Sequence, residues 1–213
     1  MNKINILLNN LDNVEIIRNQ IAAILQIETE NQLALAENAA IEDLRDFKIG
    51  VYVEKARPWE LTGSTEATSP FPLINVLLND VKQDMNPGSP VNEKKYIATF
   101  FIDCYGCGNI GSDGNDDTLA TIRAWKTARI VRNILNSGFY TYLGLRGTVR
   151  KREITEIKTG APSNMPESAL AITTCRVSFT VDYSEKSPQA GGEIFDGMMF
   201  KSLTESGVIL IDI

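Results

Sequence analysis

Two stretches of the chain repeat apolar residues at steps of three and four, the pattern of a helix that buries one face. In the first stretch the apolar positions are Val14, Ile17, Ile21, Ile24 and Leu25. Asp12 stands where an N-cap is expected, Glu15 follows at the capping-box spacing, and good helix formers continue to about Ala40. The second stretch covers residues 117–136 and stops before a Ser-Gly pair. The sequence therefore predicts two long helices.

Between and after these stretches, apolar and polar residues alternate with a period of two, which is typical of half-buried strands. The alternation predicts strands over residues 47–53, 72–79, 96–105, 139–145, 148–158 and 170–183. The 96–105 stretch is largely apolar on both faces, so we expect it at the centre of the sheet. This order of elements favours an α+β fold, a mixed and mainly antiparallel β-sheet with two main helices packed on one face and long polar loops.

A length of 213 residues is enough for one domain with an appendage. We assign residues 1–189 to a single α+β domain and residues 190–213 to a C-terminal extension. The extension ends in the apolar run 208–213, which packs on its own domain or adds as a strand to a neighbour's sheet. Basic residues cluster between Arg146 and Arg152, a placement that often protects an exposed edge strand.

Composition and charge exclude several classes of protein. The net charge of −6 argues against a general nucleic-acid binder. The chain has no histidine, which removes Ser-His and Cys-His mechanisms and the usual zinc nitrogens. No apolar run is long enough for a signal peptide or a membrane span, and three cysteines suggest a reducing compartment. Catalysis by carboxylates or lysine stays possible, although the missing histidine disfavours an enzyme, and we expect no cofactor, metal or membrane partner.

The C-x-x-C formed by Cys104 and Cys107 is the first of three motifs that crowd residues 102–117. A redox or metal role would require a helix N-terminus or further ligands. The strand alternation instead turns Cys104, like Cys175, toward the core, where a thiol acts as a small hydrophobe.

The same stretch has the spacing of a dinucleotide-binding loop and of a calcium loop, and both interpretations fail on detail. The helix begins too late after the third glycine, Gly111, and the aspartates that intervene would repel a pyrophosphate. A calcium loop that starts at Asp113 lacks its glycine and its glutamate. We interpret the stretch as a glycine exit from a strand, followed by an acidic cap at Asp116 or Asp117.

The second helix carries an aromatic and basic outward face. The residues concerned are Ile122, Trp125, Lys126, Arg129 and Arg132. Trp and Arg are enriched at interface hot spots, and a basic face in an acidic protein complements an acidic face on another copy. A subunit or partner interface is one interpretation, and a solvated basic face with Trp125 folded onto a loop is the other.

Four stretches in order resemble tail terminator (tail completion) proteins of long-tailed, especially contractile-tailed, bacteriophages. They are VYVEKARPW (51–59), KKYIATFFIDCYGCG (94–108), RAWKTARIVRNILNSGFYTYLGLRG (123–147) and VSFTVDYSEKSPQ (177–189). The resemblance covers roughly residues 12–189 and rests on the ordered combination rather than on one diagnostic motif. It implies a mixed sheet flanked by helices, no catalytic residues, and assembly into a homohexameric ring.

The resemblance also implies a place in the virion, reached after assembly in the host cytoplasm. The ring would cap the tail tube protein, stop its polymerisation and face the head connector, with the tail sheath as a further neighbour. DNA would cross the lumen without specific binding, which suits an acidic protein. Long polar loops would reach the tube, and the residues we expect there are Trp59, Asp84, Asn86, Asp113 and Asp116.

Three alternatives stay open at this point. The chain could be another head-tail neck or connector component of the same virion. From a different class, it could be a small cytosolic metal or redox protein that uses Cys104 and Cys107. It could also be a ligand-binding domain that uses the loop at 106–117.

Overall fold

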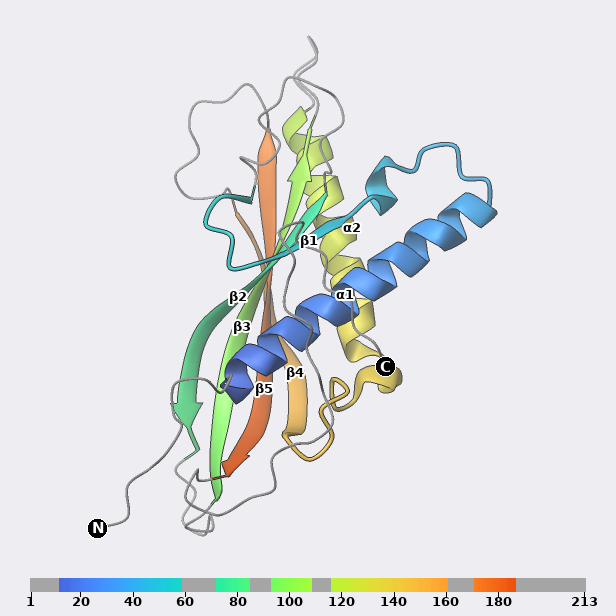
Figure 1. Cartoon of the computed structure of the whole chain (residues 1–213). Coiled ribbons are helices and arrows are strands. Elements are labelled where there is room, and N and C mark those ends of the chain that lie inside the picture. The colour runs from blue at the N-terminus through green and yellow to red at the C-terminus, as the bar shows by residue number, and fades with distance from the viewer. Residues whose placement is uncertain (1–11, 59–71, 85–92, 109–115, 161–170, 187–213) are drawn as a thin grey trace, which may run out of the picture.

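A computed structural model of the chain describes residues 12–58, 72–84, 93–108, 116–160 and 171–186 (Figure 1). These residues form two long helices, two short 3-10 helices and five strands. In chain order they are α1 (Asn13–Asn38), η1 (Arg45–Phe47), β1 (Gly50–Val53), β2 (Leu73–Gln83), β3 (Glu93–Cys107), α2 (Asp116–Asn136), η3 (Gly138–Tyr140), β4 (Val149–Gly160) and β5 (Ile172–Lys186).

The five strands form one sheet in the order β1-β2-β3-β5-β4. β1 runs parallel to β2, and every other neighbouring pair is antiparallel. The predicted α+β fold with a mixed, mainly antiparallel sheet is therefore confirmed. β3 lies at the centre, as its two apolar faces predicted, and β4 forms one edge.

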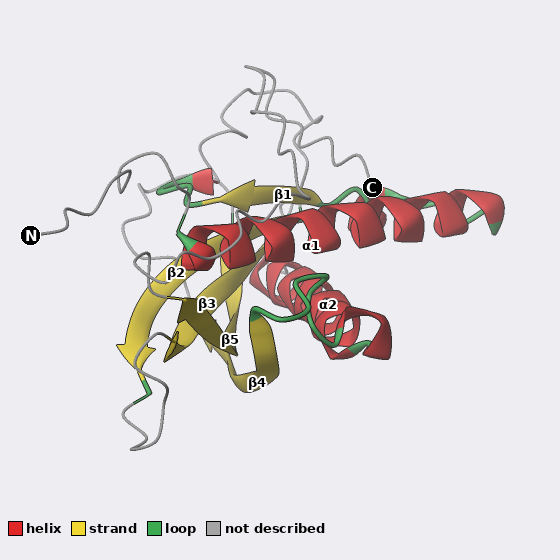
Figure 2. Cartoon of the chain, turned by 60° about the horizontal axis from the view of Figure 1, so that its bottom comes forward, coloured by secondary structure: helices red, strands yellow, loops and turns green. Residues whose placement is uncertain are grey.

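Both long helices cover the same face of the sheet (Figure 2). α1 lies over β1 and β2, whereas α2 lies over β3 and β5. Alternate residues of β3, including Phe100, Ile102 and Cys104, face the helices and are completely buried. The core thus sits between this face and the apolar stripes of the helices, as the two periodicities require.

Helix α1 begins as predicted and extends beyond the sheet. The side chain of its N-cap Asp12 accepts a hydrogen bond from the Val14 N–H at 3.2 Å, which satisfies one of the donors left open at a helix start. Its first half carries the buried stripe, and its second half extends past α2 on one side of the molecule (Figures 1 and 2).

Two predicted strands differ from the structure. Residues 139–145 form the 3-10 helix η3 and a turn, because Ser137 caps η3 and Leu143 and Gly144 adopt positive φ angles of 52° and 72°. The strand predicted over residues 47–53 is limited to β1, because η1 takes up residues 45–47.

Candidate subunit interface on helix α2

Helix α2 lies unusually close to the sheet because small residues meet a glycine. Ala120, Ala124 and Ala128 recur at four-residue steps and are buried on the sheet side of the helix. A Cβ atom on Gly106 of β3 would lie 2.1 Å from the Ala120 carbonyl oxygen and 2.4 Å from the Ala124 nitrogen. Only glycine fits at this contact. The close approach fixes α2 on β3 and thereby fixes the direction of its outward face.

The outward face of α2 forms a groove with the edge strand β4. We call it the α2 groove, and its lining residues are Thr121, Ile122, Trp125, Lys126, Ala128, Arg129, Arg132 and Ile157, around a volume of about 350 Å³. All five residues that the sequence suggested for an interface line this groove. The structure thus brings them together at one place on the surface.

The α2 groove combines exposed apolar surface with positive charge. Trp125 is 44% exposed, and Ile122 beside it is exposed to a similar extent. Within the described part of the chain, neither Arg129 nor Arg132 has an ion-pair partner. An apolar floor with unpaired guanidinium groups at its rim has the composition of a protein-binding surface.

Ile157 joins the groove through a β-bulge that the sequence analysis did not consider. Ile154 is paired with Phe179 and Ile157 with Val177, so the isoleucines are three positions apart whereas their partners are two apart. The register shift between Ile154 and Glu156 turns both isoleucines toward the helix-covered face. Apolar residues three apart within an otherwise alternating strand are the signal of such a bulge.

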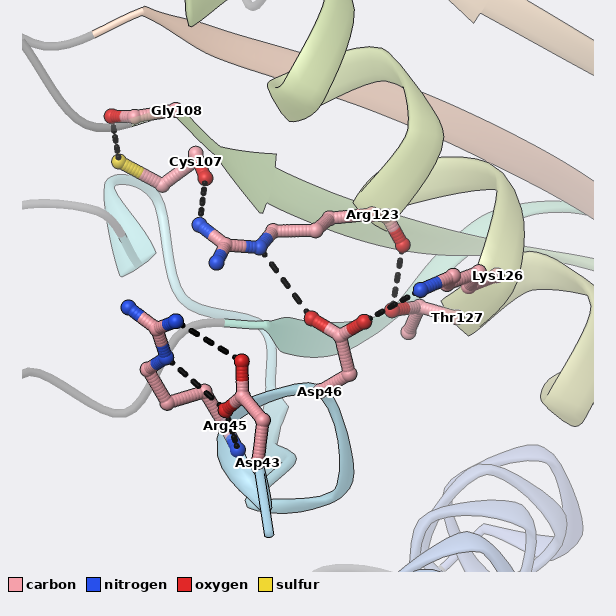
Figure 3. A network of polar contacts seen from close by, with 8 residues as sticks. All are labelled: Asp43, Arg45, Asp46, Cys107, Gly108, Arg123, Lys126 and Thr127. Atoms are coloured by element: carbon pink, nitrogen blue, oxygen red, sulfur yellow. Dashed lines mark hydrogen bonds and ion pairs between the residues drawn. The ribbon is translucent and has the colours of Figure 1, made fainter. Parts of the chain in front are cut away.

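A polar network attaches the N-terminal part of α2 to the segment after α1 (Figure 3). Asp46 of η1 accepts a hydrogen bond from Arg123 Nε at 3.2 Å and one from Lys126 Nζ at 2.5 Å. Arg123 also donates to the carbonyl oxygen of Cys107 at the end of β3, at 2.7 Å. Charge-assisted hydrogen bonds of this kind position elements with respect to one another. Arg123 lies on the flank of α2 toward η1, whereas most of the groove lies on the flank that faces β4, and Lys126 contributes to both the network and the groove.

The cysteines are buried, and their surroundings disfavour a thiolate. Cys104 and Cys107 point to opposite faces of β3, because they are an odd number of residues apart in a regular strand. Cys104 faces Cys175 in the core, and burial raises the pKa of both thiols, that of Cys175 to about 11. In the described residues, no three His, Cys, Asp or Glu side chains are grouped so that they could hold a metal ion. The predicted core position of Cys104 is confirmed.

Of the residues expected to face the tube, the structure describes two, Asp84 and Asp116, and these lie toward opposite ends of β3. Asp84 follows β2 and donates its N–H to the Lys95 carbonyl oxygen at 2.9 Å, while Asp116 begins α2 beyond the other end of β3. Asp84 is bonded to Lys95, so about 12 residues of β3 separate the two positions, or roughly 40 Å along the strand. Trp59, Asn86 and Asp113 lie outside the described residues, as does the extension 190–213.

The opposite face of the sheet carries an ion pair that the sequence analysis missed. Arg176 donates two hydrogen bonds to Asp103, from Nε to Oδ1 at 2.6 Å and from Nη2 to Oδ2 at 2.8 Å, and its guanidinium lies 4.3 Å from the ring centre of Phe101. The Asp103 side chain is 4% exposed and that of Arg176 is 42% exposed. The pair neutralises a buried carboxylate and connects β3 to β5, a structural role.

Comparison of the sequence with models of known protein families gives no match, and comparison with curated proteins gives none either. No helix in the described part of the chain is both long and apolar enough to cross a membrane.

Proposed function

We propose that the chain is a structural virion assembly protein, a ring-forming tail terminator that caps the tail tube, stops its polymerisation and joins the tail to the head connector. Its partners would be further copies of itself, six in a ring, then the tail tube protein and, at the periphery, sheath and connector proteins. No enzymatic step is part of this function.

The observation that carries the proposal is the α2 groove. Its apolar floor and basic rim are held rigidly against the sheet by the contact at Gly106. A ring needs a rigid surface of this kind on every subunit, because small errors in orientation would prevent closure. The assignment to a tail rather than to another ring-forming assembly rests on the sequence resemblance over residues 12–189.

The rival redox function has less support from the site. A reactive cysteine requires a lowered pKa and access to solvent. Cys104 has the opposite properties, since it is completely buried and its pKa is raised well above the usual value.

The role of the groove is tested by Trp125→Ala. We expect this variant to weaken subunit association more than it lowers the melting temperature, because the side chain is half exposed in the single chain and would be buried on assembly. Val81→Ala is the control, since Val81 is exposed to a similar extent on β2, away from the groove. Sedimentation velocity and negative-stain imaging of both variants give the ring yield.

An equal ring yield from Trp125→Ala and from the unmodified chain would reject this role for the groove. The capping function has its own test, in which the protein is mixed with tail tubes during their polymerisation. The proposal predicts a ring on one end of each tube and arrested growth. Tubes that grow at the same rate with the protein present would contradict it.

A further inference from the structure

The structure contains a second exposed surface whose chemistry complements the α2 groove. It lies on the second half of α1, residues 27–38, where Ile27 and Leu35 are 50% and 53% exposed. Glu30, Ala34 and Glu37 are exposed on the same side of the helix, opposite the buried Thr29 and Ala36. We call these five exposed residues the α1 knob, because this part of the helix extends beyond the sheet (Figures 1 and 2).

Charge is strongly segregated between the knob region and the groove region. Residues 19–44 contain five acidic residues and no lysine or arginine; the acidic residues are Glu28, Glu30, Glu37, Glu42 and Asp43. Residues 118–152 contain no aspartate or glutamate, and their basic residues are Arg123, Lys126, Arg129, Arg132, Arg146, Arg150, Lys151 and Arg152. Opposite surfaces of this kind attract each other and orient association.

Large exposed apolar side chains gather in the same two regions as the acidic and the basic residues. Among the residues that the structure describes, the large exposed ones fall in two regions, apart from Val81 on β2. Ile27, Leu35 and Ile41 lie on the second half of α1 and just after it, and Ile122, Trp125, Phe139 and Tyr142 lie on α2 and the turn that follows. Each of the two charged surfaces therefore also offers apolar area to bury.

The charges on both surfaces are incompletely compensated within one chain. Glu37 lies in the last turn of α1, where the helix dipole disfavours a negative charge, and this turn contains no basic residue. Across the part of the chain that the structure describes, Glu30 and Glu37 have no ion-pair partner, nor do Arg129 and Arg132. Contact between the two surfaces would compensate both.

The knob and the groove lie on different sides of the molecule. α1 covers β1 and β2 on one flank of α2, and the groove opens on the other flank beside β4. One chain therefore cannot bring its own knob to its own groove without losing the fold. Two copies can make the contact head to tail, and such a contact between two different surfaces forms a ring when the rotation between copies closes.

The two surfaces also agree in length. Residues 27–38 of α1 extend over about 18 Å, and residues 121–132 of α2 extend over about the same distance. A groove of about 350 Å³ has room for side chains such as Leu35 and Ile27 of a helix that lies across it.

We propose that the α1 knob of one copy docks into the α2 groove of the next copy. Ile27 and Leu35 pack against Ile122 and Trp125, while Glu30 and Glu37 approach Arg129 and Arg132. This inference rests on the proposed ring and names the two surfaces that build it.

Charge reversal provides the test, and every substitution is at an exposed position. The groove-reversed variant carries Arg129→Glu and Arg132→Glu, and the knob-reversed variant carries Glu30→Lys and Glu37→Lys. We expect each variant alone to associate about 100-fold more weakly or worse, because attraction becomes repulsion at the same contact. Lys48→Glu with Lys55→Glu is the control, since these exposed lysines lie outside both surfaces, and it should assemble normally.

Recovery of assembly gives the decisive result. In an equimolar mixture, groove-reversed and knob-reversed chains can alternate around the ring, so that every knob meets a groove of opposite charge. We therefore expect the mixture to assemble. One chain that carries all four reversals should assemble with itself. Because a misfolded chain could not co-assemble, recovery also shows that the variants are folded. Mass photometry and negative-stain imaging measure the assemblies.

Other results would overturn the inference. If either reversed variant alone forms rings in normal yield, the pairing of knob and groove is refuted, while the proposed function is not affected. Knob reversal without effect, together with loss on groove reversal, would point to another occupant of the groove, such as the apolar run 208–213. Failure of both the mixture and the fourfold variant to recover would also refute the pairing. An unmodified chain that never associates would instead refute the proposed function itself.

Discussion

The close contact between β3 and α2 makes Gly106→Ala an informative substitution. The added methyl group would lie 2.1 Å from the Ala120 oxygen and 2.4 Å from the Ala124 nitrogen. Both are backbone atoms, so no side-chain rotation can relieve the overlap. The helix must move away from the sheet by more than about 1 Å to restore ordinary contact, and its buried residues, such as Val131, lose packing against the sheet as it does so.

We expect this substitution to cost about 3 kcal/mol, the upper end of the usual cost of overpacking a core. For a domain of this size, such a loss lowers the melting temperature by about 6–12 °C. Gly160→Ala is the matched control, because a Cβ atom at Gly160 meets nothing within 4 Å, and it should change stability by less than about 1 kcal/mol. Thermal unfolding followed by circular dichroism measures both variants. A Gly106→Ala melting temperature equal to that of Gly160→Ala would refute the argument that this contact fixes α2.

Two further predictions concern charged groups outside the groove. Burial and the neighbouring Asp12 carboxyl group raise the pKa of Glu185 from 4.5 to about 7, so the folded chain holds a proton that the unfolded chain releases between these pH values. The free energy of unfolding should therefore fall by about 1 kcal/mol as pH rises from 4.5 to 7, a modest loss because Glu185 is partly exposed to solvent. Urea titrations at several pH values measure this decrease, which should disappear in Glu185→Gln. Asp103→Asn removes the charge that pairs with Arg176 and should cost about 1–3 kcal/mol in urea unfolding. Arg176→Lys keeps a positive charge beside the buried carboxylate, so it should lower the free energy of unfolding less than Asp103→Asn does. An equal loss from the two variants would contradict this reasoning.

Much of the fold could be predicted from local sequence pattern. In both long helices and in β3, the residues that the apolar repeat places on one face are the ones the structure buries. The N-cap at Asp12 has a local physical requirement, and it was predicted. The outward face of α2 was predicted for the same reason, since helix geometry alone places Trp125 and Arg129 on one side.

The remaining features depend on tertiary context. Residues 139–145 alternate like a strand, but the Ser137 cap and the positive φ angles at Leu143 and Gly144 make a turn that periodicity does not detect. The contribution of Ile157 to the groove needs the bulge in β4, and the role of Asp46 needs α1 and α2 to pack side by side. The acidic surface of α1 becomes meaningful only once the structure shows that it extends beyond the sheet.

The central claim is that this chain closes into a ring, and the most direct test is the mass and shape of the unmodified protein in solution. Mass photometry combined with negative-stain class averages should show one main species at about six times the 23.5 kDa of one chain, with a central opening. A species of 23.5 kDa at every concentration, unchanged when tail tubes are added, would contradict the account.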